Sequence, residues 1–317
     1  MIPYRIIFLI FFSSINHLAF SITWDEPWQE EIFQKSDYFI LGRVTDAKPG
    51  AVRIRVVRQF GDKKTEDEII LQGFHMLRIC SSSDSDKVTF YFQMIDSVYL
   101  FLKKTEIGYC LPTPTSGYAI VTNGKVLSTF RHSYHQAHLS MPVYEQCMRY
   151  IWASYKKINR DENAMRIFIE KNLQQLPAGF SGNEIALFFL QHAALEVLYH
   201  TRDVNNFKLI LPFVNCSNNH LVISAVRCLG NFNNEESRKL LIDLIKDGSR
   251  DNFVKSLAVE SLKKLNPVQE KVMLNGLIKI ASDSEIGFGG NIMDPRVCTT
   301  LPSVKQALKE LVSGLHD

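Results

Sequence analysis

Apolar residues in the first half of the chain fall into short runs that alternate with polar residues or are rich in β-branched side chains. These runs are residues 38–41, 52–56, 69–71, 88–92 and 98–102. A period of two residues is typical of strands, because successive side chains point to opposite faces. Turn residues separate the runs, and Asn123-Gly124 is typical of a two-residue hairpin loop. The pattern predicts about five to seven strands between residues 37 and 130, in a small barrel or sandwich.

The apolar period changes to that of helices near Met141. Pro142 follows at once, and proline is favoured in the first turn of a helix. Apolar residues then predict helices over residues 145–157 and 161–174, the second of which is ended by the segment 176–179, Leu-Pro-Ala-Gly. The chain is therefore predicted to change from strands to helices at about residue 141.

An alanine followed by further apolar residues recurs in the helical half. The matched sets are Ala194, Leu195 and Leu198, then Ala225, Val226 and Leu229, then Ala258, Val259 and Leu262, and finally Ala307, Leu308 and Leu311. A second series, Leu240, Leu241, Leu244 and Ile245, returns as Met273, Leu274, Leu277 and Ile278. A helix pair that is apolar on more than one face must stack on a neighbouring pair, and small alanines let the helices approach closely. The repeat predicts an α-solenoid, with an irregular helical bundle as the alternative.

This repeating unit resembles HEAT repeats, which would run as about four units from Asp161 to the C-terminus, with residues 229–234 as a turn between units. The resemblance implies an extended surface for protein binding. The spacing to the last set is longer, so an insertion falls between Ile280 and Leu301. Gly287 to Gly290 and Asp294-Pro295 predict a loop there. Because insertions in solenoids emerge together on one face, Phe288 and Asp294 are candidate binding residues.

The strand-rich half also resembles a known family. Residues 36–44, residues 54–57 followed by Phe60-Gly61, and residues 99–102 resemble the netrin-like, or tissue-inhibitor-of-metalloproteinase-like, OB barrel. The resemblance implies a small antiparallel barrel, and it raises a secreted protease inhibitor as one candidate function. Inhibitors of that family place an N-terminal cysteine in the zinc site of the protease. The N-terminus predicted below has no cysteine, so inhibition by that route is not expected.

The first residues of the chain have the pattern of a secretory signal. Arg5 precedes an unbroken apolar run over residues 6–12, which is too short for a membrane span of about 20 residues. Residues 19–21, Ala-Phe-Ser, suit a cleavage site, so residues 1–21 are predicted to be removed and Ile22 to begin the mature chain. A buried N-terminal helix is the alternative. We expect an exported protein, periplasmic or secreted, that has no membrane span after cleavage.

Composition changes this picture little. Of the 317 residues, 46% are hydrophobic and 22% are charged, which are globular values, and the formal net charge of +3 gives no reason to expect nucleic acid as a partner. Six cysteines suit an oxidising compartment. Cys80 and Cys110, both in the strand-rich half, are the candidate disulfide, whereas Cys228 falls where a repeat helix needs a small buried residue.

The candidate chemistry lies between the two halves. His132, His135 and His138 are three residues apart, which on a helix places the outer two about 120° apart and too far around the axis to share one ion. They are metal-ligand candidates only if the segment is irregular. Arg131 and Tyr134 in the same run are candidate binding residues. The alternative is a polar connector whose His and Tyr side chains bond to the backbone.

A hydroxyl-rich loop, residues 113–116, could complete a hydrolase site with these histidines, but it lacks the pattern of a nucleophile elbow. Arg53 and Arg55 share an outward strand face, which is typical of a solvated surface. No catalytic residue and no cofactor are predicted.

We therefore expect a two-domain α+β protein. The predicted parts are the signal peptide at residues 1–21, the antiparallel β-barrel at 22–130, a His-rich connector with the first helix at 131–160, and a HEAT-like α-solenoid at 161–317. Because no catalytic constellation is found, the expected function is non-enzymatic protein binding or scaffolding. A hydrolase or metal-dependent enzyme around the three histidines, and a secreted protease inhibitor, are the alternatives.

Overall fold

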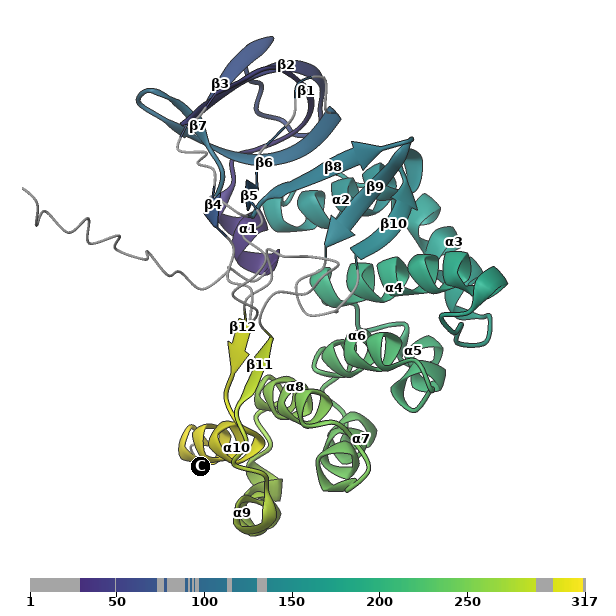
Figure 1. Cartoon of the computed structure of the whole chain (residues 1–317). Helices are drawn as coiled ribbons and strands as arrows, with labels where there is room; N and C mark the ends of the chain where they lie inside the picture. Colours follow the sequence, from purple (N-terminus) through teal and green to yellow (C-terminus); the bar gives the residue numbers. More distant parts are fainter. Residues whose placement is uncertain are drawn as a thin grey trace, which may run out of the picture.

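The computed structural model describes two regions, a closed five-strand barrel in the N-terminal half and a helical region in the C-terminal half (Figure 1). The described residues are 29–48, 50–72, 77–78, 89–90, 92, 94, 97–112, 116–129, 136–288 and 299–315. The α+β architecture predicted from the change of apolar period is confirmed. None of the helices within these ranges is both long and apolar enough to cross a bilayer.

Five strands close the barrel. They are β1 (Tyr38–Lys48), β2 (Ala51–Gln59), β3 (Glu68–Gln72), β6 (Ser97–Thr105) and β7 (Gly108–Cys110). Their order is β1-β2-β3-β7-β6, and β6 pairs back with β1. Neighbouring strands are antiparallel except β3 and β7, which are parallel. Two short strands, β4 (Leu77–Arg78) and β5 (Thr89–Phe90), pair with each other in a separate ladder.

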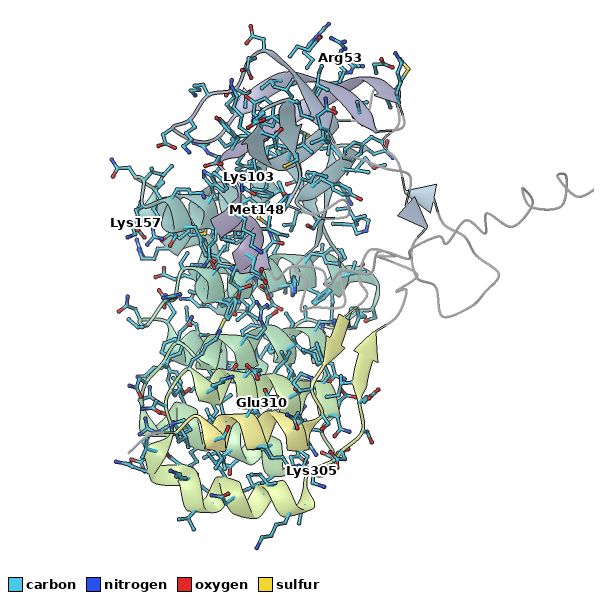
Figure 2. The ribbon with its side chains drawn as sticks, turned by 90° about the vertical axis from the view of Figure 1, so that its left-hand side faces the viewer. Arg53, Lys103, Met148, Lys157, Lys305 and Glu310 are labelled. Atoms are coloured by element: carbon cyan, nitrogen blue, oxygen red, sulfur yellow. The ribbon has the colours of Figure 1, made fainter. Side chains whose placement is uncertain are left out.

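Strand β6 is buried on both of its faces. Val98, Leu100 and Leu102 belong to the apolar cluster inside the barrel. Tyr99 and Phe101 point the other way, into a cluster that continues through the helices. This is why residues 98–102 form an unbroken apolar run instead of an alternating one. The barrel is thus covered on one side by helices, while Arg53 on β2 lies at its far, exposed side (Figure 2).

The sheet continues outside the barrel through β8 (Tyr118–Thr122), β9 (Lys125–Thr129) and β10 (Gln136–Ser140), which extend from β6. The predicted Asn123-Gly124 hairpin is confirmed, since both residues have positive φ angles, 52° and 72°, between the paired strands β8 and β9. Strand β10 lies within the segment that was expected to be a polar connector. Buried Leu139 lies between exposed His138 and Ser140, which is a strand period that the histidines conceal in the sequence.

The described helices begin and end as follows: α1 Gln29–Lys35, α2 Met141–Lys156, α3 Glu162–Leu173, α4 Ile185–His200, α5 Phe207–Val214, α6 Asn219–Leu229, α7 Glu235–Lys246, α8 Asn252–Lys263, α9 Lys271–Ile280 and α10 Val304–Ser313. Short 3₁₀ turns cover Gly182–Glu184 and Val268–Glu270. The helices predicted over 145–157 and 161–174 are confirmed as α2 and α3. Pro142 lies in the first turn of α2, and the Asp161 side chain accepts the backbone N–H of Ala164 at 2.9 Å to cap α3.

The later helices follow one another in pairs. Helix α3 packs on α4, α5 on α6, α7 on α8 and α9 on α10, and the second members α4, α6, α8 and α10 contact one another in that order (Figure 1). The recurring alanines lie on these second members and are all buried; they are Ala194, Ala225, Ala258 and Ala307. Their burial explains why the sequence repeats a small residue there.

The insertion before α10 contains strands in its described parts. Strand β11 (Ile286–Phe288) pairs antiparallel with β12 (Thr299–Leu301), and buried Ile286 lies opposite buried Leu301. The sequence predicted a loop because glycines and Asp294-Pro295 dominate this segment. Its two apolar ends pair across the insertion and pack on the helical core.

Candidate functional site

Helices α1 and α2 join the barrel to the helical region through one apolar core. Phe33 of α1 is completely buried. Its ring centroid lies 5.1 Å from that of Phe101 on β6, 5.3 Å from that of Tyr155 on α2 and 5.5 Å from that of His200 on α4. Because one side chain contacts the barrel and two helices, the barrel and the helices α2 and α4 are packed as one body at this junction.

A charged anchor lies beside this core. Glu145 of α2 accepts hydrogen bonds from Tyr99 of β6 at 2.5 Å and from Arg58 of β2 at 2.8 Å. Burial and this hydrogen bond to Glu145 raise the pKa of the Tyr99 phenol well above its usual range, so the phenol remains a donor at every physiological pH. Two barrel strands are thereby held to α2 at a defined position.

An open groove of about 970 Å³ lies where the barrel meets α2 and α3, and we call it the junction groove. Its lining comprises Gln59, Phe60, Gly61, Asp62, Pro142, Glu145, Gln146, Arg149, Tyr150, Ala153, Ile158, Asn159, Arg160, Asp161, Ala164 and Met165. The end of β2, one face of α2 and the start of α3 therefore form its walls. Amide, aromatic and charged side chains are mixed in it, which is typical of a surface that binds a protein segment.

Two groove residues, Phe60 and Tyr150, are contacted by arginines; Arg149 and Arg160 line the groove, and Arg58 lies beside it. The guanidinium carbons of Arg58 and Arg149 lie 5.8 and 5.9 Å from the centroid of Phe60. That of Arg160 lies 4.5 Å from the centroid of Tyr150. Such cation–π contacts hold the guanidinium groups flat against the rings and leave their edges free to donate hydrogen bonds.

The three arginines differ in their carboxylate partners. Arg58 is paired with Glu145 and Arg160 with Glu162, whose carboxylate oxygen lies 2.6 Å from Nε. Arg149 is exposed and makes no ion pair with any residue in the described ranges. It is therefore the groove arginine that can take a carboxylate from a partner without giving up one of its own.

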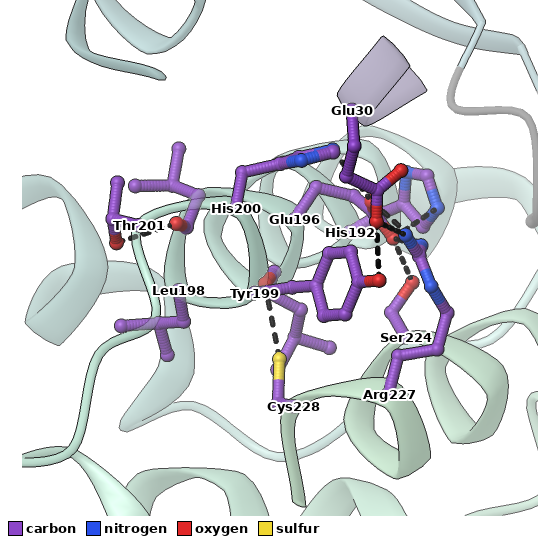
Figure 3. A network of polar contacts seen from close by, with 12 residues as sticks. Glu30, His192, Glu196, Leu198, Tyr199, His200, Thr201, Ser224, Arg227 and Cys228 are labelled. Carbon is purple, nitrogen blue, oxygen red and sulfur yellow. Dashed lines mark hydrogen bonds and ion pairs between the residues drawn. The ribbon is translucent and has the colours of Figure 1, made fainter. Parts of the chain in front are cut away.

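A second polar feature lies among the helices (Figure 3), with most of its side chains buried, Glu30 half-buried and Lys264 exposed. We call it the buried charge cluster, and its members are Glu30, His192, Glu196, Tyr199, His200, Ser224, Arg227 and Lys264. Glu196 of α4 accepts hydrogen bonds from Arg227 at 2.8 Å to each oxygen and from Ser224 at 2.7 Å, both on α6. This bidentate pair joins two successive helix pairs through their second members.

Helix α1 reaches the buried charge cluster through Glu30, whose carboxylate accepts the Tyr199 hydroxyl and lies 3.8 Å from Arg227 Nη2. Lys264 donates to the same Tyr199 oxygen at 2.9 Å. Burial works against ionisation of Glu30, but Arg227 and His200 outweigh it and lower the pKa of this carboxyl to about 2. Burial lowers the pKa of His200 to about 4, so this imidazole is neutral at pH 7.

The residues predicted from the sequence as site candidates are not brought together within the described ranges. His138 lies exposed on β10, with its ring centroid 5.7 Å from that of Phe189 on α4. Phe288 is described through its backbone in β11. His132, His135, Arg131, Tyr134, Asp294, Cys80 and residues 113–115 lie outside the described residues. The metal site and the pairing of Cys80 with Cys110 of β7 therefore stay predictions.

In the described ranges, no group of three His, Cys, Asp or Glu side chains is arranged to hold a metal ion. Closeness of such side chains does not by itself make a metal site. In the buried charge cluster, for example, the Glu196 carboxylate is already bound by Arg227 and Ser224. Sequence reasoning found neither this cluster nor the junction groove. A signal for the cluster exists, because His192, Glu196 and His200 recur every four residues in an otherwise apolar helix.

Comparison of the chain with protein-family models, with curated proteins and with solved structures finds no match in any of the three.

Proposed function

We propose that this chain is an exported, non-enzymatic binding protein whose partner is a protein segment that docks in the junction groove and presents a carboxylate to Arg149. The observation that carries the proposal is the placement of Arg149, which lies over Phe60 at the barrel–helix junction without an ion pair in the described ranges. Arginine and aromatic side chains are enriched where protein interfaces bind most strongly.

Two architectural assignments belong to this proposal. The strand order β1-β2-β3-β7-β6, with its one parallel pair, supports an OB-like, netrin-like barrel. The paired helices and their buried alanines support a HEAT-like solenoid. In this assignment the barrel and α2 fix one end of an extended helical surface, and the junction groove lies at that end.

The groove fits a peptide segment better than a small metabolite. It is open to solvent along the barrel–helix boundary and is lined by the amide of Asn159, which can both donate to and accept from a peptide backbone. The amides of Gln59 and Gln146 already bond to the backbone of Thr65 and Ala164. Asp62 also lines the groove, is exposed and can take a basic group. A segment with an acidic residue for Arg149 and an apolar neighbour for Phe60 would match these walls.

A selection experiment tests the docking. Random twelve-residue peptides are selected against the full chain, and the enriched peptides are measured again on two variants. Arg149→Glu is expected to weaken binding by about tenfold or more, because an attraction becomes a repulsion. Lys239→Glu, an exposed cation on α7, is the matched control and leaves affinity unchanged. Selected peptides that lack Asp or Glu, or that bind Arg149→Glu equally well, would refute the proposal.

Export is tested on the same protein. The chain is recovered from cells that express the full sequence, and its N-terminal residues are read by mass spectrometry. Because residues 19–21 suit a signal peptidase, the exported fraction should begin at Ile22. A chain that begins at Met1 and stays inside the cell would contradict export while leaving the docking result untouched.

A further inference from the structure

Three ionisable side chains form one stripe along α4. His192, Glu196 and His200 are four residues apart, so they share a helix face, and all three are buried. The Nε2 atom of His192 lies 3.9 Å from one oxygen of Glu196, and that of His200 lies 3.7 Å from the other. One carboxylate thus lies between two imidazoles.

His200 is the member that contacts α1 and α2 directly. Its ring meets Phe33 of α1 edge-on, with centroids 5.5 Å apart, and its Nδ1 atom lies 3.2 Å from the Tyr155 hydroxyl of α2. Glu30 of α1 enters the same cluster from above and accepts the Tyr199 hydroxyl (Figure 3). His200 therefore contacts α1 through Phe33 and lies in the same cluster as Glu30.

The charges around His200 balance only while its imidazole is neutral. Buried Glu196 and Arg227 of α6 carry opposite charges, and half-buried Glu30 and exposed Lys264, just after α8, form a second opposite pair at the edge of the cluster. The charged groups that face His200 are these same four. Protonation of buried His200 would add a positive charge without a counter-charge away from water, which a protein interior tolerates poorly.

Movement of helix α1 alone can relieve this excess of positive charge while the other helices stay in place. Helix α1 has seven residues and buries Gln29, Ile32 and Phe33, whereas α4, α6 and α8 pack on one another along their length. At its C-terminal end α1 is held separately, because Lys156 of α2 donates to the backbone oxygens of Gln34 and Ser36. Opening at the Glu30 end is therefore the least costly rearrangement.

We propose that the buried charge cluster is an acid-operated latch, in which protonation of His200 releases α1 from α4 and α6. Above about pH 6.5 the His200 imidazole is neutral and α1 is held. As the pH falls below that value, the imidazole is protonated more readily in water than in the buried position. The open state is therefore favoured and the latch opens.

The direction of the pH dependence of latch opening follows from the direction in which the pKa of His200 is shifted. Its pKa in the closed state is about 4, below the ordinary value of 6.5, so the closed state binds protons less readily than the open one. The free energy that holds α1 is complete above pH 6.5 and is lost as the pH falls from 6.5 toward 4. Glu30, with a pKa of about 2, stays charged throughout this range, so its own protonation does not open the latch.

Hydrogen–deuterium exchange on the full wild-type chain tests the latch. After correction for intrinsic exchange, the opening constant of the α1 amides should rise by about 70-fold between about pH 7.5 and about pH 4.5, from the shift of His200. Helices α3 and α7 serve as internal references and should stay protected. If α1 remains protected at the lower pH, or if all three helices open together, the latch is refuted.

Two variants make the result specific to His200. His200→Gln removes the titrating group, and the opening constant of the α1 amides should then stay the same across the range. His138→Gln alters an exposed histidine outside the cluster and should open like the wild type. Should His200→Gln fail to fold, the wild-type measurement with its internal references still decides the question.

Discussion

Replacing Arg227 with alanine should lower the free energy of unfolding by about 3–5 kcal/mol, because the change leaves Glu196 as a buried carboxylate without its bidentate partner. Ser224 keeps one hydrogen bond to Glu196, and both imidazoles lie near it, but none of these groups carries a permanent positive charge. Glu30 loses the same guanidinium. Chemical denaturation at about pH 7.5 measures the loss.

Two further variants separate charge from packing at this position. Arg227→Met together with Glu196→Leu removes the ion pair and refills its volume, so it should cost less than Arg227→Ala alone. Arg166→Ala on α3 breaks an exposed pair with Glu170 and should change stability by less than about 0.5 kcal/mol. A loss below about 1 kcal/mol for Arg227→Ala would show that the pair is not the structural centre of the cluster.

Replacing Phe33 with alanine should also cost about 3–5 kcal/mol, the range found when a fully buried aromatic ring is removed. The ring fills the space between β6, α2 and α4, and each of these elements would lose a contact at once. Thermal unfolding followed by circular dichroism measures the change, which should appear as one shifted transition.

Two variants serve as controls for Phe33→Ala, one for the size of the side chain and one for its exposure. Phe33→Leu keeps most of the apolar volume and should recover more than half of the loss. Leu176→Ala, at a side chain that is 86% exposed, should be close to neutral. If Phe33→Ala also proves neutral, α1 does not join the barrel to the helices, and the role assigned to it would have to be abandoned.

The helices and the hairpin could be predicted from the sequence because their signals are local. The four buried alanines recur at positions where second helices pack on one another, and the Asn123-Gly124 turn needs positive φ angles that these two residue types supply. Strand β10 was missed, because buried Leu139 lies between two exposed polar residues, His138 and Ser140. One apolar residue between polar neighbours shows almost no strand period.

The junction groove could not be predicted, since its walls come from distant parts of the chain. Arg58 and Glu145 are 87 positions apart, and no local pattern brings Phe60 beside Arg149. For the buried charge cluster, the sequence contains part of the signal. Three ionisable residues on one face of an apolar helix require partners, but the sequence alone does not reveal that Arg227 and Glu30 supply them.

The two-sided burial of β6 has an evolutionary consequence. A protein with the barrel but without the helices would expose Tyr99 and Phe101 on its surface. A protein with the helices but without the barrel would expose Trp152. Recombination between genes at this boundary would therefore yield proteins with exposed apolar surface, which tend to aggregate, whichever half was kept. Selection should therefore have kept the two halves of this protein inherited together, with substitutions at 101 tied to those at 152.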